Sequence, residues 1–324
     1  MKKNVVALDI GYSNFRVAYG QGDKFKSCIF PAGVKEGHSC NIKAKEEHDP
    51  PFCVNIGGIS HIAGIEPMQT ETRALHRWYI ESDQYLALFY AGLIQSGYSK
   101  IDCLVTGVTM SEYLEGTQVK QLTKMMTGVH HVAPNVKIEV DDVHVVAQPF
   151  GSYFNSILRN SMDRFLSSVL VFDAGFYSLD WALFHKGKII ESTSGSSMLA
   201  VSMVLEEVSK LLYKDCRMAL PIAEIEAALR KGRNYVFCFG KKHKLDSYIK
   251  RATEKMSTEI YDTILNRLRM SENPVDIVVL TGGGVVYYED IVRRIFPSSE
   301  LIIEPDPLFS AVHGYYHYGL SKQG

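Results

Sequence analysis

The 324-residue sequence lacks the cysteine patterns that mark many metal-binding and redox proteins. Its six cysteines include no Cys-x-x-Cys pair, so neither a zinc ribbon nor a dithiol redox motif is predicted, and reduced thiols are expected. His38, Cys40, His48 and Cys53 lie close together in the chain, but their spacing matches no standard zinc finger. A polar loop is therefore the favoured interpretation of that segment.

Long runs of basic or apolar residues are also missing. The formal net charge is −1 and no long basic run occurs, which argues against direct binding to nucleic acid. Asp9 interrupts the N-terminal apolar run before the core of a signal peptide is complete. The longest apolar stretch, residues 85–94, is far shorter than the roughly 20 residues that a membrane span needs. We therefore expect a cytoplasmic protein that contacts neither nucleic acid nor membrane directly.

The composition itself excludes few classes of protein. Hydrophobic residues make up 46% and charged residues 22% of the chain, close to ordinary globular usage, which argues against a disordered, collagenous or disulfide-scaffold class. At about 150 residues per domain, the length predicts two domains.

An internal repeat is the most informative feature that the sequence does contain. Residues 5–18 (VVALDIGYSNFRVA) are echoed by residues 169–182 (VLVFDAGFYSLDWA), so that Asp9 matches Asp173 and Gly11 matches Gly175. Each copy has an apolar run, an Asp-x-Gly sequence, a small polar residue and a second apolar run that ends near a turn. This pattern predicts a β-hairpin in each copy.

The Asp-x-Gly sequence suits a phosphate site, although aspartate and glycine also serve as plain turn residues. Glycine lets the backbone approach a ligand closely and present N–H groups to an anion, while aspartate at a strand end can hold a hydrated Mg²⁺. Its occurrence twice in the same context favours a pair of turns that hold the phosphates of a nucleotide.

The segments around the two copies alternate between strand and helix patterns. Ser82 or Asp83 is expected to cap a helix that stops at Gly97, and a strand is expected at residues 101–105. Helical spacing recurs at residues 199–212 and 256–268, where the apolar stripes are most simply core-facing. A buried-strand pattern from Val275 runs into Gly282, Gly283 and Gly284 ahead of another helix, which is a unit that favours nucleotides. No Walker motif is present.

In this order, the motifs resemble those of the actin, Hsp70 and sugar-kinase superfamily, and most of all the ParM/StbA group of bacterial and plasmid actins. The resemblance runs from Asp9 to about Gly314. It implies an α/β, actin-like (ribonuclease H-like) fold with duplicated domains that flank a nucleotide cleft. Residues 1–155 with 305–324 would form domain I, and residues 156–304 domain II, because the segment after Pro305 resembles the helix that returns the chain to domain I.

The resemblance assigns roles to individual residues. Asp9 and Asp173 would hold Mg²⁺ through water, and Gln148 would position the attacking water. Arg16 stands where the family commonly has a phosphate-contacting lysine, and Phe176 and Tyr177 replace the usual glycine and threonine of the second phosphate motif. The full set of residues expected to bind the nucleotide is Gly11, Tyr12, Ser13, Asn14, Arg16, Gly175, Phe176, Tyr177, Ser178, Gly195, Gly282, Gly283 and Gly284.

For the function, the resemblance implies an ATPase that binds ATP or ADP with Mg²⁺ and polymerises into dynamic filaments. In the ParM group, such filaments segregate plasmids through a DNA-bound adaptor protein (ParR-like), so self-association and an adaptor are the expected partners. A small-molecule kinase of the same superfamily and a non-segregating bacterial cytoskeletal actin remain as alternatives. A kinase would need a further carboxylate as base for its acceptor.

Overall fold

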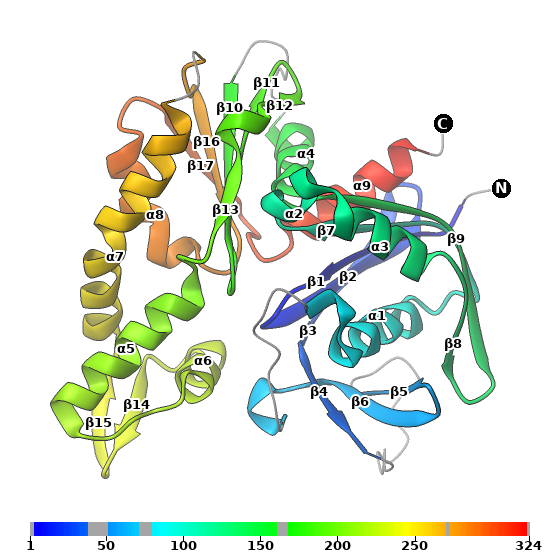
Figure 1. Cartoon of the computed structure of the whole chain (residues 1–324), viewed down its shortest axis with the longest axis horizontal. Coiled ribbons are helices and arrows are strands. Elements are labelled where there is room, and N and C mark those ends of the chain that lie inside the picture. The colour runs from blue at the N-terminus through cyan, green and yellow to red at the C-terminus, as the bar shows by residue number, and fades with distance from the viewer. Residues whose placement is uncertain (1–2, 38–50, 71–78, 161–167, 270–272, 323–324) are drawn as a thin grey trace. The chain divides into compact units, whose positions relative to one another are not determined.

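The computed structural model describes residues 3–37, 51–70, 79–160, 168–269 and 273–322 (Figure 1). His38, Cys40 and His48 lie outside the described residues. The chain divides into two compact units, Met1–Met162 with Leu308–Gly324, and Asp163–Pro307. Each unit is described by itself below.

The first unit is built on a six-stranded sheet in the order β3-β2-β1-β7-β9-β8. β1 pairs antiparallel with β2 and parallel with β7, which pairs parallel with β9. A second, three-stranded sheet has the order β4-β6-β5. The strands are β1 (Val5–Ile10), β2 (Asn14–Gln21), β3 (Lys24–Pro31), β4 (Gly33–Glu36), β5 (Phe52–Ile56), β6 (Ile59–Ile65), β7 (Lys100–Val108), β8 (Gly128–Ala133) and β9 (Val136–Ala147).

Helices cover both faces of the six-stranded sheet (Figure 1). Because side chains alternate along a strand, Val6 and Leu8 of β1 pack in the core shared with α1, whereas Val5 and Ala7 pack in the core shared with α9. The helices of this unit are α1 (Asp83–Ser96), α2 (Met110–Glu115), α3 (Thr117–Met126), α4 (Gln148–Asn160) and α9 (Ser310–Ser321), with 3₁₀ turns η1 (Pro67–Gln69) and η2 (Tyr79–Glu81).

Two glycines set the contact between α4 and α9. A Cβ built on Gly314 would lie 1.7 Å from the carbonyl oxygen of Gly151, so the two backbones touch only because neither position carries a side chain. This contact fixes the C-terminal helix against the helix that begins at Gln148.

The second unit repeats the topology of the first. Its main sheet has the order β12-β11-β10-β16-β17, in which β10 pairs antiparallel with β11 and parallel with β16. The strands are β10 (Ser168–Ala174), β11 (Leu179–His185), β12 (Lys188–Ile189), β13 (Gly195–Ser197), β14 (Tyr235–Cys238), β15 (Lys241–Lys244), β16 (Ile277–Thr281) and β17 (Glu300–Ile303). The helices are η3 (Glu191–Thr193), α5 (Val201–Cys216), α6 (Ile222–Arg230), α7 (Leu245–Leu268) and α8 (Val285–Ile295).

The predicted hairpins and helices are found in the structure. β1 with β2 and β10 with β11 are the two hairpins of the internal repeat. The side chain of Ser82 accepts a hydrogen bond from the Tyr85 N–H and caps α1, and Gly97 ends that helix at a φ of 69°. The apolar stripes at residues 199–212 and 256–268 face the core of the second unit; they lie in α5 and α7, except that Leu199 precedes α5.

The cysteines differ in part from the expectation of reduced thiols. Cys53 in β5 is disulfide-bonded, whereas Cys28, Cys103, Cys216 and Cys238 are free. Sequence spacing did not reveal the disulfide, because pairing depends on distance in space and not along the chain. No helix among the described residues has the length and apolar character that crossing a bilayer requires.

Candidate functional site

The turn between β1 and β2 holds the first group of predicted phosphate-binding residues. The Gly11 N–H donates to the carbonyl oxygen of Asn14 over 3.1 Å and closes the turn. A Cβ on Gly11 would lie 3.0 Å from that same oxygen, which explains why glycine occupies the position. Tyr12, Ser13 and Asn14 are half-buried, and the Asn14 amide donates to the Ser13 hydroxyl over 3.3 Å.

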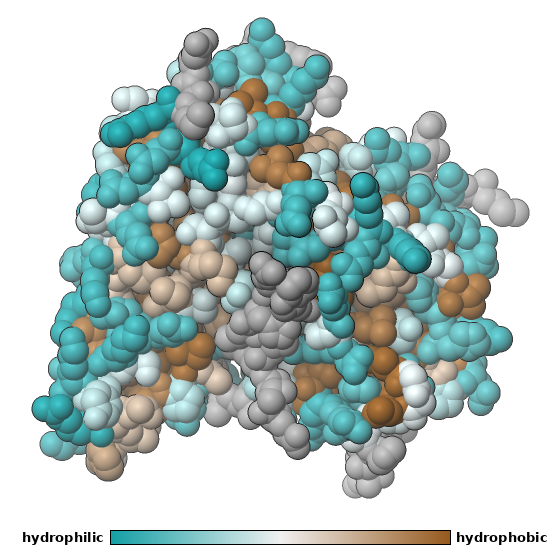
Figure 2. All heavy atoms as spheres, in the orientation of Figure 1, coloured by the Kyte–Doolittle hydropathy of each residue, from teal (hydrophilic) through white to brown (hydrophobic). Residues whose placement is uncertain are grey.

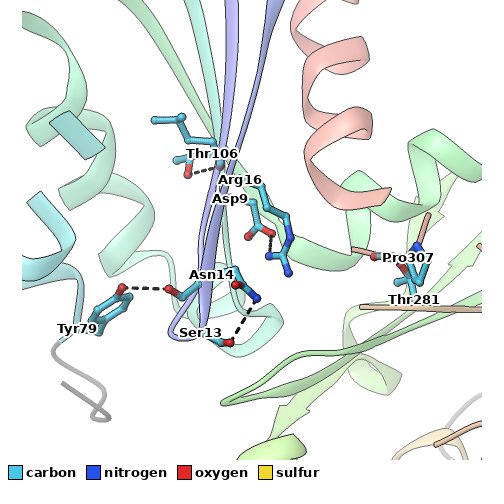
Figure 3. Close-up of polar contacts among 10 residues, drawn as sticks. Asp9, Ser13, Asn14, Arg16, Tyr79, Thr106, Thr281 and Pro307 are labelled. Carbon is cyan, nitrogen blue, oxygen red and sulfur yellow. Dashed lines mark hydrogen bonds and ion pairs between the residues drawn. The ribbon is translucent and has the colours of Figure 1, made fainter. Parts of the chain in front are cut away.

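Asp9 and Arg16 form an ion pair across this hairpin. They are register partners on β1 and β2, and the Arg16 guanidinium donates to Asp9 Oδ2 over 2.7 Å (Figure 3). Their side chains are only 10% and 12% exposed. Arg16 Nε is buried and has no hydrogen-bond partner within the described part of the chain. Arg16 thus neutralises the predicted magnesium ligand and keeps an unused donor.

Aromatic side chains support the same turn from outside the repeat. Tyr79 of η2 stacks on Tyr12, with ring centroids 4.3 Å apart, and its hydroxyl donates to the carbonyl oxygen of Gly11 over 3.1 Å. The sequence prediction missed Tyr79, because no spacing in the chain connects residue 79 with residue 11. The contact holds the backbone of the turn in place.

Gln148 lies at the same edge of the first sheet as Asp9. It is the first residue of α4 and directly follows Ala147, the last residue of β9. Because β1, β7 and β9 are parallel, their carboxyl ends share one edge, which is where ligands bind in open α/β sheets. Gln148 is half-buried there, as a group that contacts a water or a ligand would be.

A threonine on the strand between them fixes this edge. The Thr106 hydroxyl of β7 donates to the carbonyl oxygen of Leu8 over 2.9 Å (Figure 3). Burial raises the pKa of Tyr85 well above the ordinary value of a phenol, and the Tyr85 hydroxyl hydrogen-bonds to Thr106. The hydroxyl groups of Thr106 and Tyr85 therefore lie behind Asp9.

The turn between β10 and β11 has the same backbone as the first turn. The Gly175 N–H donates to the carbonyl oxygen of Ser178 over 3.0 Å, and a Cβ on Gly175 would lie 2.7 Å from that oxygen. The register is also equivalent, since Asp173 faces Asp180 as Asp9 faces Arg16. The repeat seen in the sequence is thus a repeat in hydrogen bonding and strand register.

The second turn differs from the first in what supports it. The N–H groups of Val201 and Ser202, at the start of α5, donate to the carbonyl oxygens of Gly175 and Phe176 over 3.3 and 2.8 Å. The Phe176 side chain packs against the core of the second unit, so it anchors the turn where the family more often has a glycine. Tyr177 is half-buried beside it.

Asp180 is a buried carboxylate with hydroxyl partners. It is 1% exposed, and the hydroxyls of Ser178 and Ser196 both donate to it. Ser196 belongs to β13, where it is the register partner of Asp180. Gly195, the residue before it, packs on the indole ring of Trp181, which a Cβ would approach to 3.1 Å. Gly195 thus has a structural role in addition to the predicted binding role.

The three-glycine turn after β16 lies against the end of β10. Gly282 has a φ of 87°, and a Cβ there would lie 2.5 Å from both Asp173 Oδ1 and the Ala174 carbonyl oxygen. The Gly284 N–H donates to that carbonyl over 2.8 Å, while Gly283 is exposed. The Thr281 hydroxyl and the Gly282 N–H both donate to the Pro307 carbonyl (Figure 3). Asp173 and the glycine turn therefore form one group.

Comparisons with known proteins agree with this architecture. A family model described as actin-like proteins, N-terminal domain, matches residues 7–151, and one described as archaeal actin homologue MreB-like, C-terminal, matches residues 171–293. A sequence search among curated proteins gives no match.

Solved structures match over nearly the whole length. The native crystal structure of Ta0583, an archaeal actin homolog, is 19% identical with a TM-score of 0.79, and all of both chains is covered. Its complex with ADP is 18% identical with a TM-score of 0.78 and the same coverage. The chain in a 15-stranded ParM filament from Clostridium botulinum is 18% identical with a TM-score of 0.72, and 99% of this chain and 100% of that chain are covered. At these identities the likeness is one of fold.

Proposed function

We propose that this chain, which belongs to the actin-like proteins, is an ATPase that polymerises with ATP and Mg²⁺ and loses its filaments on hydrolysis. The cargo we propose is a plasmid or another DNA molecule, held through a DNA-bound, ParR-like adaptor. The two compact units would correspond to domain I (1–155 with 305–324) and domain II (156–304).

The duplicated turn is the observation that carries this proposal. Two turns with the same glycine N–H bond and the same aspartate position lie at the ends of two topologically equivalent sheets. Phosphoryl transfer needs mainly positioning and charge, which such turns and carboxylates supply. The ADP complex of the archaeal homolog gives a relative of this fold with a bound nucleotide.

The donor set at each turn fits a nucleotide with Mg²⁺. Carboxylate oxygens are the ligands that this ion prefers, usually with several of its waters retained. Asp9 and Asp173 would hold it through water, and Mg²⁺ would neutralise charge on the phosphates. Arg16 pairs with Asp9, and its Nε is buried without a partner among the described side chains, so contact with a phosphate oxygen would need its side chain to move.

Gln148 would orient the attacking water. An amide is no general base, but it can hold a water in line with the γ-phosphate, as glutamines do in other nucleotide hydrolases. The position of Gln148 at the carboxyl edge shared with Asp9 supports this role. Slow hydrolysis is expected from such a group.

Filament formation and phosphate release, followed together, test the proposal. Purified protein is mixed with ATP and Mg²⁺, with ADP and Mg²⁺, or with ATP and a chelator. We expect light scattering to rise only in the first mixture and phosphate release to follow it. Scattering that stays flat at every protein concentration would exclude filaments, and release that needs an added acceptor would indicate a kinase instead.

Two Gln→Ala variants distinguish a specific role of Gln148 from a general loss of stability. Gln148→Ala should slow phosphate release at least 10-fold while scattering still rises with ATP. Gln21→Ala makes the same chemical change at an exposed position of β2 and should leave both signals unchanged. Equal release rates in the two variants would show that Gln148 does not position the water.

The segregation role is tested in cells. A plasmid that carries the gene with its flanking DNA should be retained, and Gln148→Ala should raise its loss rate. The 15-stranded ParM filament, whose chain has the same fold, supports the filament part of this proposal. Equal retention with and without the gene would exclude a role in segregation.

A further inference from the structure

Two cysteines and a histidine meet within the second unit, away from both Asp-x-Gly turns in the sequence. Cys216, Cys238 and His243 each offer a ligand atom, and these atoms all lie within 4.8 Å of one another. Around a tetrahedral zinc, with Zn–S of about 2.3 Å and Zn–N of about 2.0 Å, ligand atoms lie roughly 3.5–3.8 Å apart. A contraction of at most about 1.3 Å therefore brings the three atoms to that geometry.

The backbone bends directly after each cysteine. Arg217 and Phe239 have φ values of 54° and 47°, and they are two of the four non-glycine residues with positive φ in the described part of the chain. Such conformations cost energy for residues with a side chain, most of all for a bulky one such as phenylalanine, and persist where the surroundings impose them. At Phe239 the bend forms the tight turn from β14 into β15 and so brings Cys238 and His243 together.

Two further contacts orient the side chains of His243 and Cys216. His243 Nδ1 lies 3.3 Å from the Tyr248 hydroxyl of α7, and this contact would orient the ring and leave Nε2 for the metal. The Cys216 thiol donates to the carbonyl oxygen of Leu212, in the preceding turn of α5, over 2.8 Å. It would give up this bond on losing its proton to a metal.

We propose that Cys216, Cys238 and His243 bind one Zn²⁺, with a water as the fourth ligand. Thiolate and imidazole are the ligands that zinc prefers, and a Cys₂His set with water is one of its established coordination types. The three ligands come from the end of α5, from β14 and from β15. The ion would therefore join the β14–β15 hairpin to the helix.

The hairpin is held by Val236 and Cys238 in the core and by contacts of β14 with α6 and α7, but by no neighbouring strand in the described part of the chain. A two-stranded sheet is marginally stable by itself, and β14 and β15 pair with no other strand among the described residues. Its apolar side chains are divided: Val236 and Cys238 are buried, whereas Phe237 and Phe239 are 57% and 77% exposed. The hairpin, at the lower left of Figure 2, shows apolar atoms at the surface. A metal staple would hold these exposed aromatic residues in a fixed position.

A redox pair is the main competing interpretation of the two thiols. A disulfide would need the two sulfur atoms about 2.05 Å apart, and Cys216 and Cys238 are both free thiols in this structure. The nearby histidine and its Tyr248 contact also have no part in a disulfide, whereas a zinc site uses both.

Metal content and cobalt absorption test the site directly. Untagged, full-length protein is stripped with a chelator under reducing conditions and then titrated with Zn²⁺ or Co²⁺. We expect one ion per chain and, with Co²⁺, the intense charge-transfer absorption that thiolate ligands give. Co²⁺ without that absorption, or zinc that a weak chelator removes completely, would overturn the proposal.

Matched variants assign the ligands. Cys238→Ser and His243→Ala should each weaken zinc binding by more than 100-fold, since loss of an outer partner alone costs 10–100-fold. Tyr248→Phe should weaken it by about 10-fold. Cys28→Ser removes a free thiol in β3 of the first unit and should bind like the parent. Unchanged affinity in both ligand variants, or a Cys216–Cys238 disulfide found by mass spectrometry in the unstripped protein, would refute the site.

Hydrogen exchange tests whether zinc stabilises the β14–β15 hairpin, independently of the number of ions bound per chain. With Zn²⁺, amides of residues 235–244 should exchange at least 10-fold more slowly in the parent and in Cys28→Ser. The His243→Ala variant keeps both thiols and should fold, because the His243 side chain is only half-buried. Zinc should not slow amide exchange in the hairpin of this variant. Equal exchange with and without zinc in the parent would exclude the staple.

Discussion

The two hairpins of the internal repeat share a backbone and differ in charge. In β1–β2 and β10–β11 the same glycine N–H closes the turn and the same strand position carries aspartate. The register partner of that aspartate is Arg16 in the first hairpin and Asp180 in the second. The first pair is neutral, whereas the second places two carboxylates opposite each other.

The same turn geometry therefore occurs in two different electrostatic environments. In the first hairpin the aspartate is already paired with a cation, Arg16. In the second, Asp180 is satisfied by Ser178 and Ser196, so Asp173 carries the charge that a Mg²⁺ with its waters would meet. The two predicted magnesium ligands are therefore unequal, and substitutions at them should have opposite effects on stability.

Asp9→Asn should cause the largest loss of stability. It leaves the Arg16 charge buried without its partner, and removing one member of a buried pair costs about 3–5 kcal/mol. Thermal and denaturant unfolding measure the loss. The double variant Asp9→Asn with Arg16→Gln should recover part of it, and a double variant that is no more stable than Asp9→Asn alone would show that the pair contributes little.

Asp173→Asn should instead damage activity without damaging the fold. Asp173 faces the like charge of Asp180, and like charges opposite each other on a sheet are destabilising. We expect unfolding free energy to stay the same or to rise slightly, while phosphate release falls by about 10²–10³-fold. A stability loss as large as that of Asp9→Asn would remove the contrast between the hairpins.

Local patterns in the sequence were enough to predict much of this fold. The two hairpins are confirmed, because strand alternation and turn glycines are properties of neighbouring residues. The capped helix from Ser82 to Gly97 is confirmed for the same reason. The actin-like α/β fold, which the order of the motifs implied through their resemblance to a family, is also confirmed. The roles of Gln148, Asp9 and Asp173 stay predictions that the proposed experiments test.

Contacts between distant segments could not be predicted in the same way. The Tyr79 hydroxyl on Gly11, the Ser196 hydroxyl on Asp180 and the Cys216–Cys238–His243 cluster each join residues that only the folded chain brings together. The packing of Phe176 against the core, which explains a large side chain at this position of the turn, is likewise a contact that only the folded chain forms.

Gly11→Ala and Gly175→Ala compare how well the backbone of each turn tolerates a Cβ atom. The new Cβ would lie 2.7 Å from the Ser178 carbonyl in Gly175→Ala, but 3.0 Å from the Asn14 carbonyl in Gly11→Ala. The second turn is also tied to α5 by two N–H groups, so it can relax less. We expect losses of about 1–3 kcal/mol in unfolding free energy, with Gly175→Ala the larger. Equal losses would show that support from α5 adds no rigidity.

Tyr79→Phe makes the smallest change and tests the support of the first turn alone. The ring and its stack on Tyr12 are kept, and only the hydroxyl that donates to Gly11 is lost. A hydrogen bond of this kind contributes about 0.5–1.5 kcal/mol. The free energy of unfolding should fall by that amount. Because the Gly11 carbonyl belongs to the turn, the Michaelis constant for ATP should rise, while the second hairpin is unaffected.

Tyr90→Phe, which removes a phenol hydroxyl from α1 of the same unit, is the matched control and should leave the Michaelis constant unchanged. If Tyr79→Phe behaves like that control, the first turn keeps its shape without side-chain support, and the two hairpins differ in charge alone.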